Sequence, residues 1–320
     1  MLIEGYYITD RNNDLYAVKG LTHPPGKVVA IPKYLWNGQA YSKVQDYQTA
    51  IYLLEKTREE YLHKNDENYG ATIPAIPKTE IKTVKEPTWH LSKQHNELTR
   101  VANELYIELS QYLNLENLGG FTGSLMLGLF GSESDIDIVI YGVNAGREVY
   151  ETLQELRRLN ITTYLDYESA EKFLRKRRDT SEKISDWIKH EKNKVLTGVY
   201  HGKVYNFKLV PYPSEFGEGY GIRRIRRLGK VEVICEITDD TYSIFTPNIY
   251  SVNVVKVLRG PDNTWEGEFI ISFRSRYAEQ GRTGDRIKVH GILEEIHEKE
   301  GHSYYRILVG VDNLDYMLRT

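Results

Sequence analysis

The sequence predicts an α+β protein, in which a core of mixed sheet and helices follows a β-rich N-terminal segment and precedes a small C-terminal β-barrel. Short apolar runs between turn residues open the chain, apolar stripes at helical spacing fill its middle, and about five short alternating runs close it. A chain of 320 residues with 40% hydrophobic residues can bury such cores. We expect four parts: a β-rich segment with a helix (1–63), an extended linker (64–88), the core (89–218) and the barrel (219–320).

The first part of the chain is predicted to hold three strands and a helix. Residues 47–62 carry apolar side chains at helical spacing. The stretch from 63 to 87 is polar and contains three prolines, so we expect an extended linker or an arm that wraps a neighbouring part. The predicted strands are the apolar runs 4–10, 15–20 and 27–31.

The core is predicted to alternate helices and strands around residues 121–142. Apolar stripes indicate helices over 89–113 and 143–159. The basic run Arg175–Arg178 spreads around a further helix, where it either steers an anionic ligand or forms a solvated turn. The remaining predicted elements are a strand at 161–165, that helix at 171–194 and a strand at 204–210.

The last part of the chain carries a basic run and then alternating strands. Residues 223–227 are read as a hinge whose arginines clamp phosphates or simply decorate a connector. The strands that follow suggest a small closed barrel, of the oligonucleotide-binding type, although this part is net acidic. Aromatic side chains that could stack on bases there are Tyr242, Phe245, Tyr250 and Phe273. The predicted strands are 230–238, 249–258, 268–273, 286–293 and 304–311.

Composition limits the classes of protein that fit. No apolar run approaches the roughly 18 residues needed to cross a bilayer, and the N-terminus lacks a signal peptide pattern, so we expect no membrane partner. One cysteine, Cys235, excludes an internal disulfide and fits a reducing cytoplasm, while histidines unpaired with cysteine argue against zinc. The net charge is −3, yet residues 145–228 hold 18 basic and 12 acidic side chains. This positive middle suits a triphosphate or a nucleic-acid backbone, or reflects ordinary solvated helices.

The residues that point to chemistry are Gly123-Ser124 and, ten residues later, Asp135-Ile136-Asp137. Side chains at i and i+2 of a strand share one face, so both aspartates would project together and need a cation between them. Mg²⁺, or Mn²⁺ in its place, suits two carboxylates combined with substrate phosphates. Gly123 lacks the Cβ that would keep a phosphate from the backbone, and Ser124 offers a hydroxyl and an N–H at the start of a helix. The alternative is a buried hairpin whose aspartates cap a helix or pair with arginines.

This order resembles the DNA-polymerase-beta-like nucleotidyltransferase superfamily, over roughly residues 90–215. The matching residues are Thr122-Gly123-Ser124, Gly128 and Asp135-Ile136-Asp137-Ile138. The whole chain resembles uncharacterised archaeal members. The resemblance implies transfer of a nucleoside monophosphate from a nucleoside triphosphate (NTP) to an acceptor hydroxyl, possible acceptors being an RNA 3′ end, a protein or a small molecule. It implies that Gly123 and Ser124 hold the triphosphate, and that Asp135 and Asp137 are catalytic and bind the metal.

The run ending Lys208-Leu209-Val210-Pro211 resembles the third motif of CCA-adding and poly(A)-adding enzymes, but Lys208 replaces their third carboxylate. Lys208 either neutralises the acidic pair, leaving an inactive nucleotide- or RNA-binding protein, or Asn206 supplies an oxygen ligand after a register shift. In a third alternative a loop supplies the carboxylate. The candidates for it are Asp166, Glu168 and Glu133. Lys208, Arg223 and Arg224 are predicted to bind nucleotide.

Overall fold

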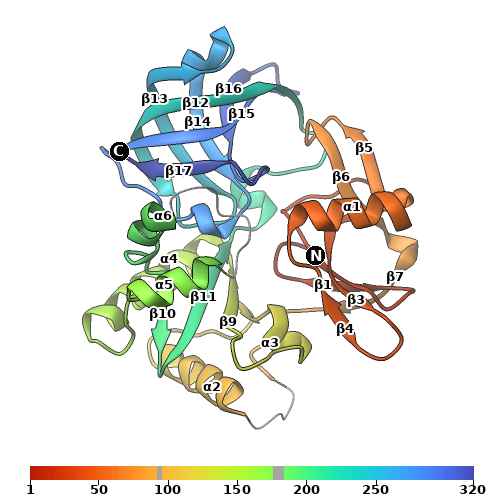
Figure 1. Ribbon diagram of the computed structural model, residues 1–320, viewed down its shortest axis with the longest axis vertical. Coiled ribbons are helices and arrows are strands. Elements are labelled where there is room, and N and C mark those ends of the chain that lie inside the picture. Colours follow the sequence, from red (N-terminus) through yellow and green to blue (C-terminus); the bar gives the residue numbers. More distant parts are fainter. Residues whose placement is uncertain (92–95, 176–183) are drawn as a thin grey trace.

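The computed structural model describes residues 1–91, 96–175 and 184–320. Three sheets, of seven, four and six strands, organise these residues, and helices pack mainly around the second. In Figure 1 the seven-stranded sheet lies to the right, the four-stranded sheet with its helices to the lower left, and the six-stranded sheet at the top. The predicted α+β class is therefore confirmed.

The N-terminal sheet has the strand order β5-β6-β3-β2-β1-β7, with β4 paired to β3. Because β5, β6 and β7 belong to it, the prediction of an extended linker over 64–88 is wrong. Pro74 is the last residue of β6 that pairs with β5, and Pro77 is the last that pairs with β3. A proline has no N–H to donate, so it can be accommodated where the pairing of two strands ends. The elements are β1 (Tyr7–Asp10), β2 (Leu15–Val18), β3 (Lys27–Trp36), β4 (Tyr41–Lys43), α1 (Tyr47–Thr57), β5 (Leu62–Asp66), β6 (Ala71–Pro77) and β7 (Ile81–Lys85).

The central sheet has the order β10-β11-β9-β8, and β9 and β11 run parallel. The predicted strand at 161–165 is absent as a strand, since Thr163 makes only an isolated bridge to Val199. The predicted helix 171–194 is two helices on either side of residues 176–183, so Lys176, Arg177 and Arg178 lie outside the described residues. The elements are α2 (Glu97–Ser110), β8 (Gly119–Phe121), α3 (Gly123–Leu127), β9 (Ile136–Tyr141), α4 (Val143–Arg158), α5 (Tyr167–Arg175), α6 (Ile184–Glu191), β10 (Thr197–Tyr200) and β11 (Lys203–Val210).

The C-terminal sheet has the order β12-β13-β14-β16-β15-β17, and β12 also pairs with β15. Five of its strands therefore pair in a closed cycle, which we call the ring. The pair β14–β16 is parallel and the other pairs are antiparallel. The strands are β12 (Arg223–Tyr242), β13 (Asn248–Arg259), β14 (Gly267–Ser272), β15 (Arg286–Glu298), β16 (Ser303–Leu308) and β17 (Tyr316–Arg319).

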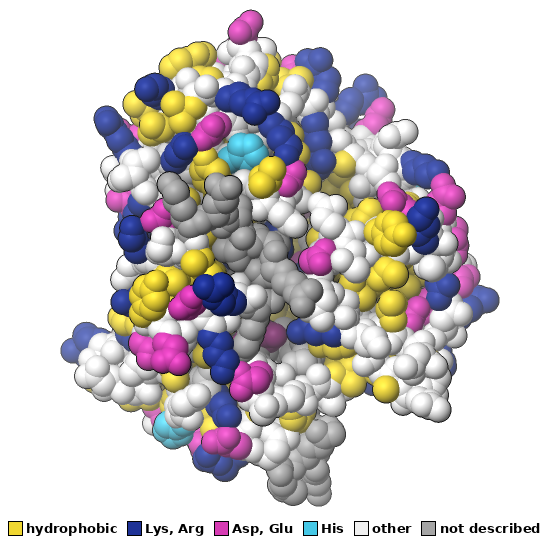
Figure 2. Space-filling view, viewed as in Figure 1, with side chains coloured by type: hydrophobic (Ala, Val, Ile, Leu, Met, Phe, Trp, Pro, Cys, Tyr) yellow, Lys and Arg dark blue, Asp and Glu magenta, His cyan; other side chains and the backbone are white. Residues whose placement is uncertain are grey.

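The basic run at 223–227 is the beginning of β12, so the predicted hinge is wrong. In the register of β12 with β15, Arg226 stands opposite Glu295 and Arg227 opposite Glu294, and each pair forms a salt bridge. Arg226 and Arg227 are thus held by acidic partners on the neighbouring strand. The positive segment predicted over 145–228 is consequently divided between the central sheet and the ring. In Figure 2 basic and acidic side chains are interspersed, and a group of basic ones lies at the top, over the ring.

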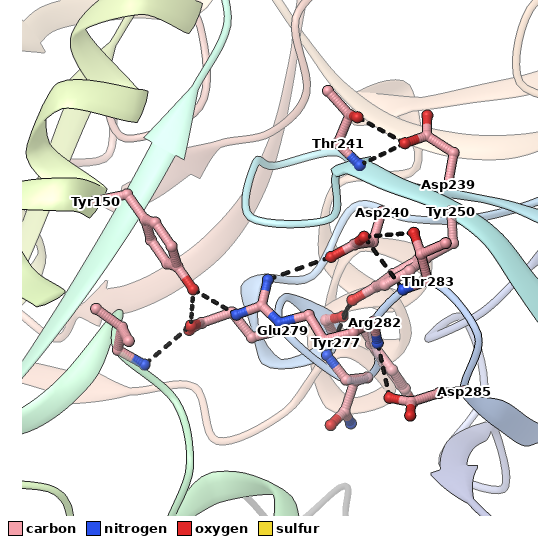
Figure 3. A network of polar contacts seen from close by, with 12 residues as sticks. Tyr150, Asp239, Asp240, Thr241, Tyr250, Tyr277, Glu279, Arg282, Thr283 and Asp285 are labelled. Carbon is pink, nitrogen blue, oxygen red and sulfur yellow. Dashed lines mark hydrogen bonds and ion pairs between the residues drawn. The ribbon is translucent and has the colours of Figure 1, made fainter.

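A buried polar network joins the ring to the central sheet (Figure 3). The Glu279 carboxylate accepts hydrogen bonds from the Tyr150 hydroxyl of α4 at 2.8 Å and from the backbone N–H groups of residues 195 and 196 at 2.9 and 3.0 Å. Arg282 donates to the same Tyr150 hydroxyl at 2.6 Å. These contacts fix how the ring sits on α4. Within the described residues, no helix combines the length and the apolar character that a membrane crossing requires.

Candidate functional site

The predicted loop and the second aspartate lie against each other. Gly123 opens α3 with φ +63°, and a Cβ at this position would lie 2.7 Å from Oδ2 of Asp137. The Thr122 N–H donates to the Asp137 carbonyl oxygen at 2.9 Å. The Asp137 carboxylate therefore occupies the space that the missing side chain of Gly123 leaves, as only glycine allows at this backbone conformation.

Local sequence explains why the chain returns to this point. Phe121 of β8 pairs antiparallel with Ile138 of β9, so the two strands run side by side and the loop spans their ends. Helix α3 stops after five residues because Gly128 adopts a left-handed conformation with φ +70°. Ile136, Ile138 and Ile140 are fully buried, which leaves the half-buried Asp137 on the other face of β9.

Asp135 directly precedes β9 and is half-buried. The pKa of Lys172 on α5 is raised, first by its hydrogen bond to Glu133 and also by the Asp135 carboxylate. If the alternation of β9 is extended by one residue, Asp135 is expected on the same side of the chain as Asp137. Since Glu133 pairs with Lys172 at 2.5 Å, and Asp166 accepts the Ser169 N–H at 2.7 Å at the start of α5, these two predicted loop carboxylates have partners outside the acidic pair.

The register of β11 on β9 decides which residue stands next to the acidic pair. Asn206 is opposite Asp137, and Lys208 is opposite Val139. Asn206 Nδ2 donates to Oδ1 of Asp137 at 3.3 Å, whereas Lys208 Nζ donates to Oε1 of Glu4 at 2.6 Å. The register therefore brings Asn206, and not Lys208, beside Asp137, with its amide nitrogen toward the carboxylate and its amide oxygen accepting from Thr197 Oγ1 at 3.4 Å.

The N-terminal sheet surrounds this site, which the sequence did not indicate. Glu4 is 2% exposed and pairs with both Lys19, at 2.8 Å, and Lys208. Burial raises the pKa of Glu4, but the two ammonium groups outweigh it and hold the value at about 2. Burial raises the pKa of Tyr34 to about 12, and the Asp137 carboxylate adds to this shift. Glu4, Lys19 and Tyr34 lie more than 80 positions before the motif, so no local pattern could have assigned them to the site.

Arg223 and Arg224 lie in another place. Arg223 pairs with Glu218 at 3.1 Å and Arg224 with Glu67 at 3.0 Å, and both line a cavity of about 840 Å³ between the ring and residues 63–68. Among the described residues, neither arginine contacts the loop at Gly123 or the acidic pair. Their charge is compensated within the protein, so the structure does not bring them to the predicted site.

The side chains at this site fit a magnesium ion whose remaining ligands are supplied by a substrate. The described part of the chain contains no group of three or more histidine, cysteine or acidic side chains able to hold a metal ion. Asp135, Asp137 and, after rotation of its amide, Asn206 offer oxygen ligands, and glycine at position 123 lets the loop backbone come into direct contact with the Asp137 carboxylate. Mg²⁺ is usually bound by one or two carboxylates plus phosphates and water, not by an all-protein cage.

Comparison with known proteins gives one informative similarity. No family model matches the chain, and no solved structure matches it. The chain is 28% identical over 318 residues to the uncharacterised protein MJ1086 of Methanocaldococcus jannaschii, covering 92% of this chain and 91% of that protein. Because the alignment covers 92% of this chain, it includes residues of all three sheets. The relative comes from an archaeon.

Proposed function

We propose that this protein is a metal-dependent nucleotidyltransferase that transfers a nucleoside monophosphate from an NTP to an acceptor hydroxyl. The observation that supports it most directly is the approach of Gly123 to Asp137, because it holds the loop backbone against a carboxylate on a rigid strand. Asn206 beside them, whose Nδ2 donates to Asp137, would supply a third oxygen ligand after rotation of its amide. A surface hairpin with two capping aspartates would not require a left-handed glycine against one of them.

In this proposal each residue has a defined task. Asp135 and Asp137, with Asn206, would hold Mg²⁺, and the ion would neutralise charge on the phosphates. The acceptor hydroxyl oxygen attacks the α-phosphorus, the bond from that phosphorus to the bridging oxygen breaks, and pyrophosphate leaves with that electron pair. A carboxylate of the acidic pair takes the proton of the hydroxyl. Gly123 and Ser124 position the triphosphate for this displacement.

We infer that the acceptor is single-stranded RNA and that the ring is a small barrel of the oligonucleotide-binding type. Five strands in a closed cycle support the barrel. A cavity of about 340 Å³ beside the ring is lined by Tyr242, Phe269 and Tyr304, the last two edge to face, and also by Glu215, Glu218 and Glu298. The aromatic side chains suit stacked bases, whereas the buried Arg306 of the same cavity is paired with Glu294. Of the other aromatic residues predicted to stack, Phe245 and Tyr250 are fully buried in the core, whereas Phe273 is half-buried.

The alternative of an inactive, nucleotide-binding protein receives less support. It requires the Lys208 ammonium to neutralise the acidic pair, and the ion pair that Lys208 makes is with Glu4. Asp137 retains a neutral amide, Asn206, as its side-chain neighbour on β11. An amide next to a carboxylate leaves the negative charge that a cation needs.

The test is incubation of the protein with labelled NTPs and RNA oligonucleotides in Mg²⁺ or Mn²⁺. We expect label on the RNA, lost in the Asp135→Ala, Asp137→Ala double variant. The matched control removes two exposed acidic side chains of the ring, Asp262→Ala with Glu266→Ala, and keeps the activity. Transfer that survives in the first double variant would exclude these aspartates from catalysis. Absence of transfer with every nucleotide and with RNA, protein or small-molecule acceptors would exclude the activity.

A further inference from the structure

A cluster of lysines lies beside the acidic pair. Two of them, Lys19 and Lys208, share the single carboxylate of Glu4. Lys19 directly follows β2, while Lys208 lies on β11, next but one to Asn206. The two side chains are 36% and 20% exposed, so a ligand in solvent can reach them although Glu4 itself is buried.

A third lysine, Lys33 on β3, is half-buried and differs from the other two in its surroundings. No acidic side chain among the described residues lies within 4.0 Å of its ammonium group. Burial lowers the pKa of Lys33 to about 8, and Lys43, Lys19 and Lys208 contribute to the decrease, while the Asp137 carboxylate opposes it. The protonation of Lys33 is therefore coupled to Asp137 and to the lysines near it.

The cluster carries more positive than negative charge. Four lysines stand against three carboxylates, those of Glu4, Asp137 and its neighbour Asp135, which leaves a surplus of one positive charge. Positive charge that is partly withdrawn from water without a counter-ion is costly, and a multivalent anion would compensate it. The lysines of the cluster are Lys19, Lys33, Lys43 and Lys208.

We propose that Lys19, Lys33 and Lys208 bind the β- and γ-phosphates of the NTP. The N-terminal sheet is then the phosphate-binding part of the active site, an inference that rests on the proposed function. The ammonium groups of Lys19 and Lys208 meet at one carboxylate, and positive charges that close match the dense charge of a polyphosphate. An RNA backbone carries its charges one per nucleotide and would require them along a track. Proximity to Asp137 places the polyphosphate where a metal held by the acidic pair would also contact it.

The test measures binding of inorganic triphosphate by calorimetry at low salt, without metal. We expect the wild type to bind, Lys33→Ala to bind at least tenfold more weakly, and Lys33→Arg to retain most of the affinity. Lys27→Ala is the matched control, because it removes the same charge from the other end of β3, roughly 20 Å away at the usual rise per residue. Within the described part of the chain Lys33 forms no ion pair, so no carboxylate there loses a salt-bridge partner when Lys33 is replaced. Thermal unfolding checks that the variant is folded.

The possible outcomes separate this inference from the proposed function. Equal triphosphate affinities in wild type and Lys33→Ala overturn the phosphate site, and so does displacement of bound triphosphate by a single-stranded RNA lacking a 5′ phosphate. Binding that depends on Lys33 in a protein without transfer activity supports the phosphate site while the catalytic proposal fails. In an active protein, Lys33→Ala should raise the KM for the NTP at least tenfold and change kcat less. If Lys33→Ala transfers label with an unchanged KM for the NTP, the proposed function is retained and the phosphate site is rejected.

Discussion

Replacing Gly123 by alanine probes the geometry on which the site depends. The substitution adds one methyl group at a residue with φ +63°, 2.7 Å from Oδ2 of Asp137. The left-handed conformation alone costs an alanine about 1–2 kcal/mol. Ordinary van der Waals contact begins at 3.4 Å, so the carboxylate must also retreat by the difference, about 0.7 Å.

The displacement matters more for activity than for stability. A misplacement of about 1 Å at a reacting centre can reduce a rate about a hundredfold, so a retreat of about 0.7 Å should reduce transfer by one to two orders of magnitude. The free energy of unfolding should fall by about 2 kcal/mol, of which the backbone conformation accounts for at least half.

Two glycines provide the controls for urea unfolding and for labelled transfer. Gly26 has φ +72°, and a Cβ added there would meet nothing within 4 Å, so Gly26→Ala reports the backbone cost alone. Gly131 lies in the connection between Gly123 and Asp137, and a Cβ added there would also meet nothing within 4 Å. Gly131→Ala should therefore change neither the free energy of unfolding nor the transfer rate. If Gly123→Ala unfolds like Gly26→Ala and transfers label at the wild-type rate, the contact with Asp137 has no role and the reasoning is refuted.

Two further substitutions test how the parts of the molecule are held together. Glu4→Gln should lower the free energy of unfolding at pH 7 by about 3 kcal/mol, because the pKa of Glu4 is held at about 2 instead of 4.5. In the wild type this stability is complete above pH 4.5 and is lost as the pH falls towards 2, and urea unfolding across that range should show a flatter pH dependence in the variant; equal slopes would contradict it. Glu279→Gln places an amide NH₂ group, which cannot accept a hydrogen bond, where the carboxylate accepts from the N–H groups of residues 195 and 196. It should lower the free energy of unfolding by about 3 kcal/mol, whereas Tyr150→Phe should lower it by about 1 kcal/mol. Equal losses in the two variants would contradict the network.

The central motif was readable from sequence because its parts are local. Gly123 and Asp137 are joined by a short connection, and a strand next to a hairpin loop returns the chain to its start. Asn206 was only one of several alternatives, because strand register depends on partners that lie about 70 residues away. The strand around Lys208 was located correctly, but whether Lys208 or Asn206 meets Asp137 is decided by a shift of two residues, which keeps the same face and the same apolar pattern.

The beginning of β12 carries a signal that is visible only when two distant segments are compared. Residues 223–227 read Arg-Arg-Ile-Arg-Arg, and residues 294–298 read Glu-Glu-Ile-His-Glu. Antiparallel pairing sets Ile225 against Ile296 and three of the four arginines against glutamates, the fourth facing His297, and opposite charges on facing strands favour such a pairing. Taken alone the basic run suggests phosphate binding; compared with its acidic complement it indicates a strand pair.

The N-terminal sheet belongs to the site as much as to the scaffold. The Thr122 hydroxyl donates to the Gly5 carbonyl oxygen at 2.6 Å, and the Tyr141 hydroxyl donates to the Glu4 carbonyl oxygen at 3.0 Å. Both ends of the motif, its loop and the end of β9, are thus tied to the start of the chain, where the Glu4 carboxylate also holds Lys208. Removing the N-terminal sheet would leave these hydroxyls and Lys208 without partners at the position that must be rigid for chemistry. The central sheet is therefore complete only with the first strands of the chain packed on it.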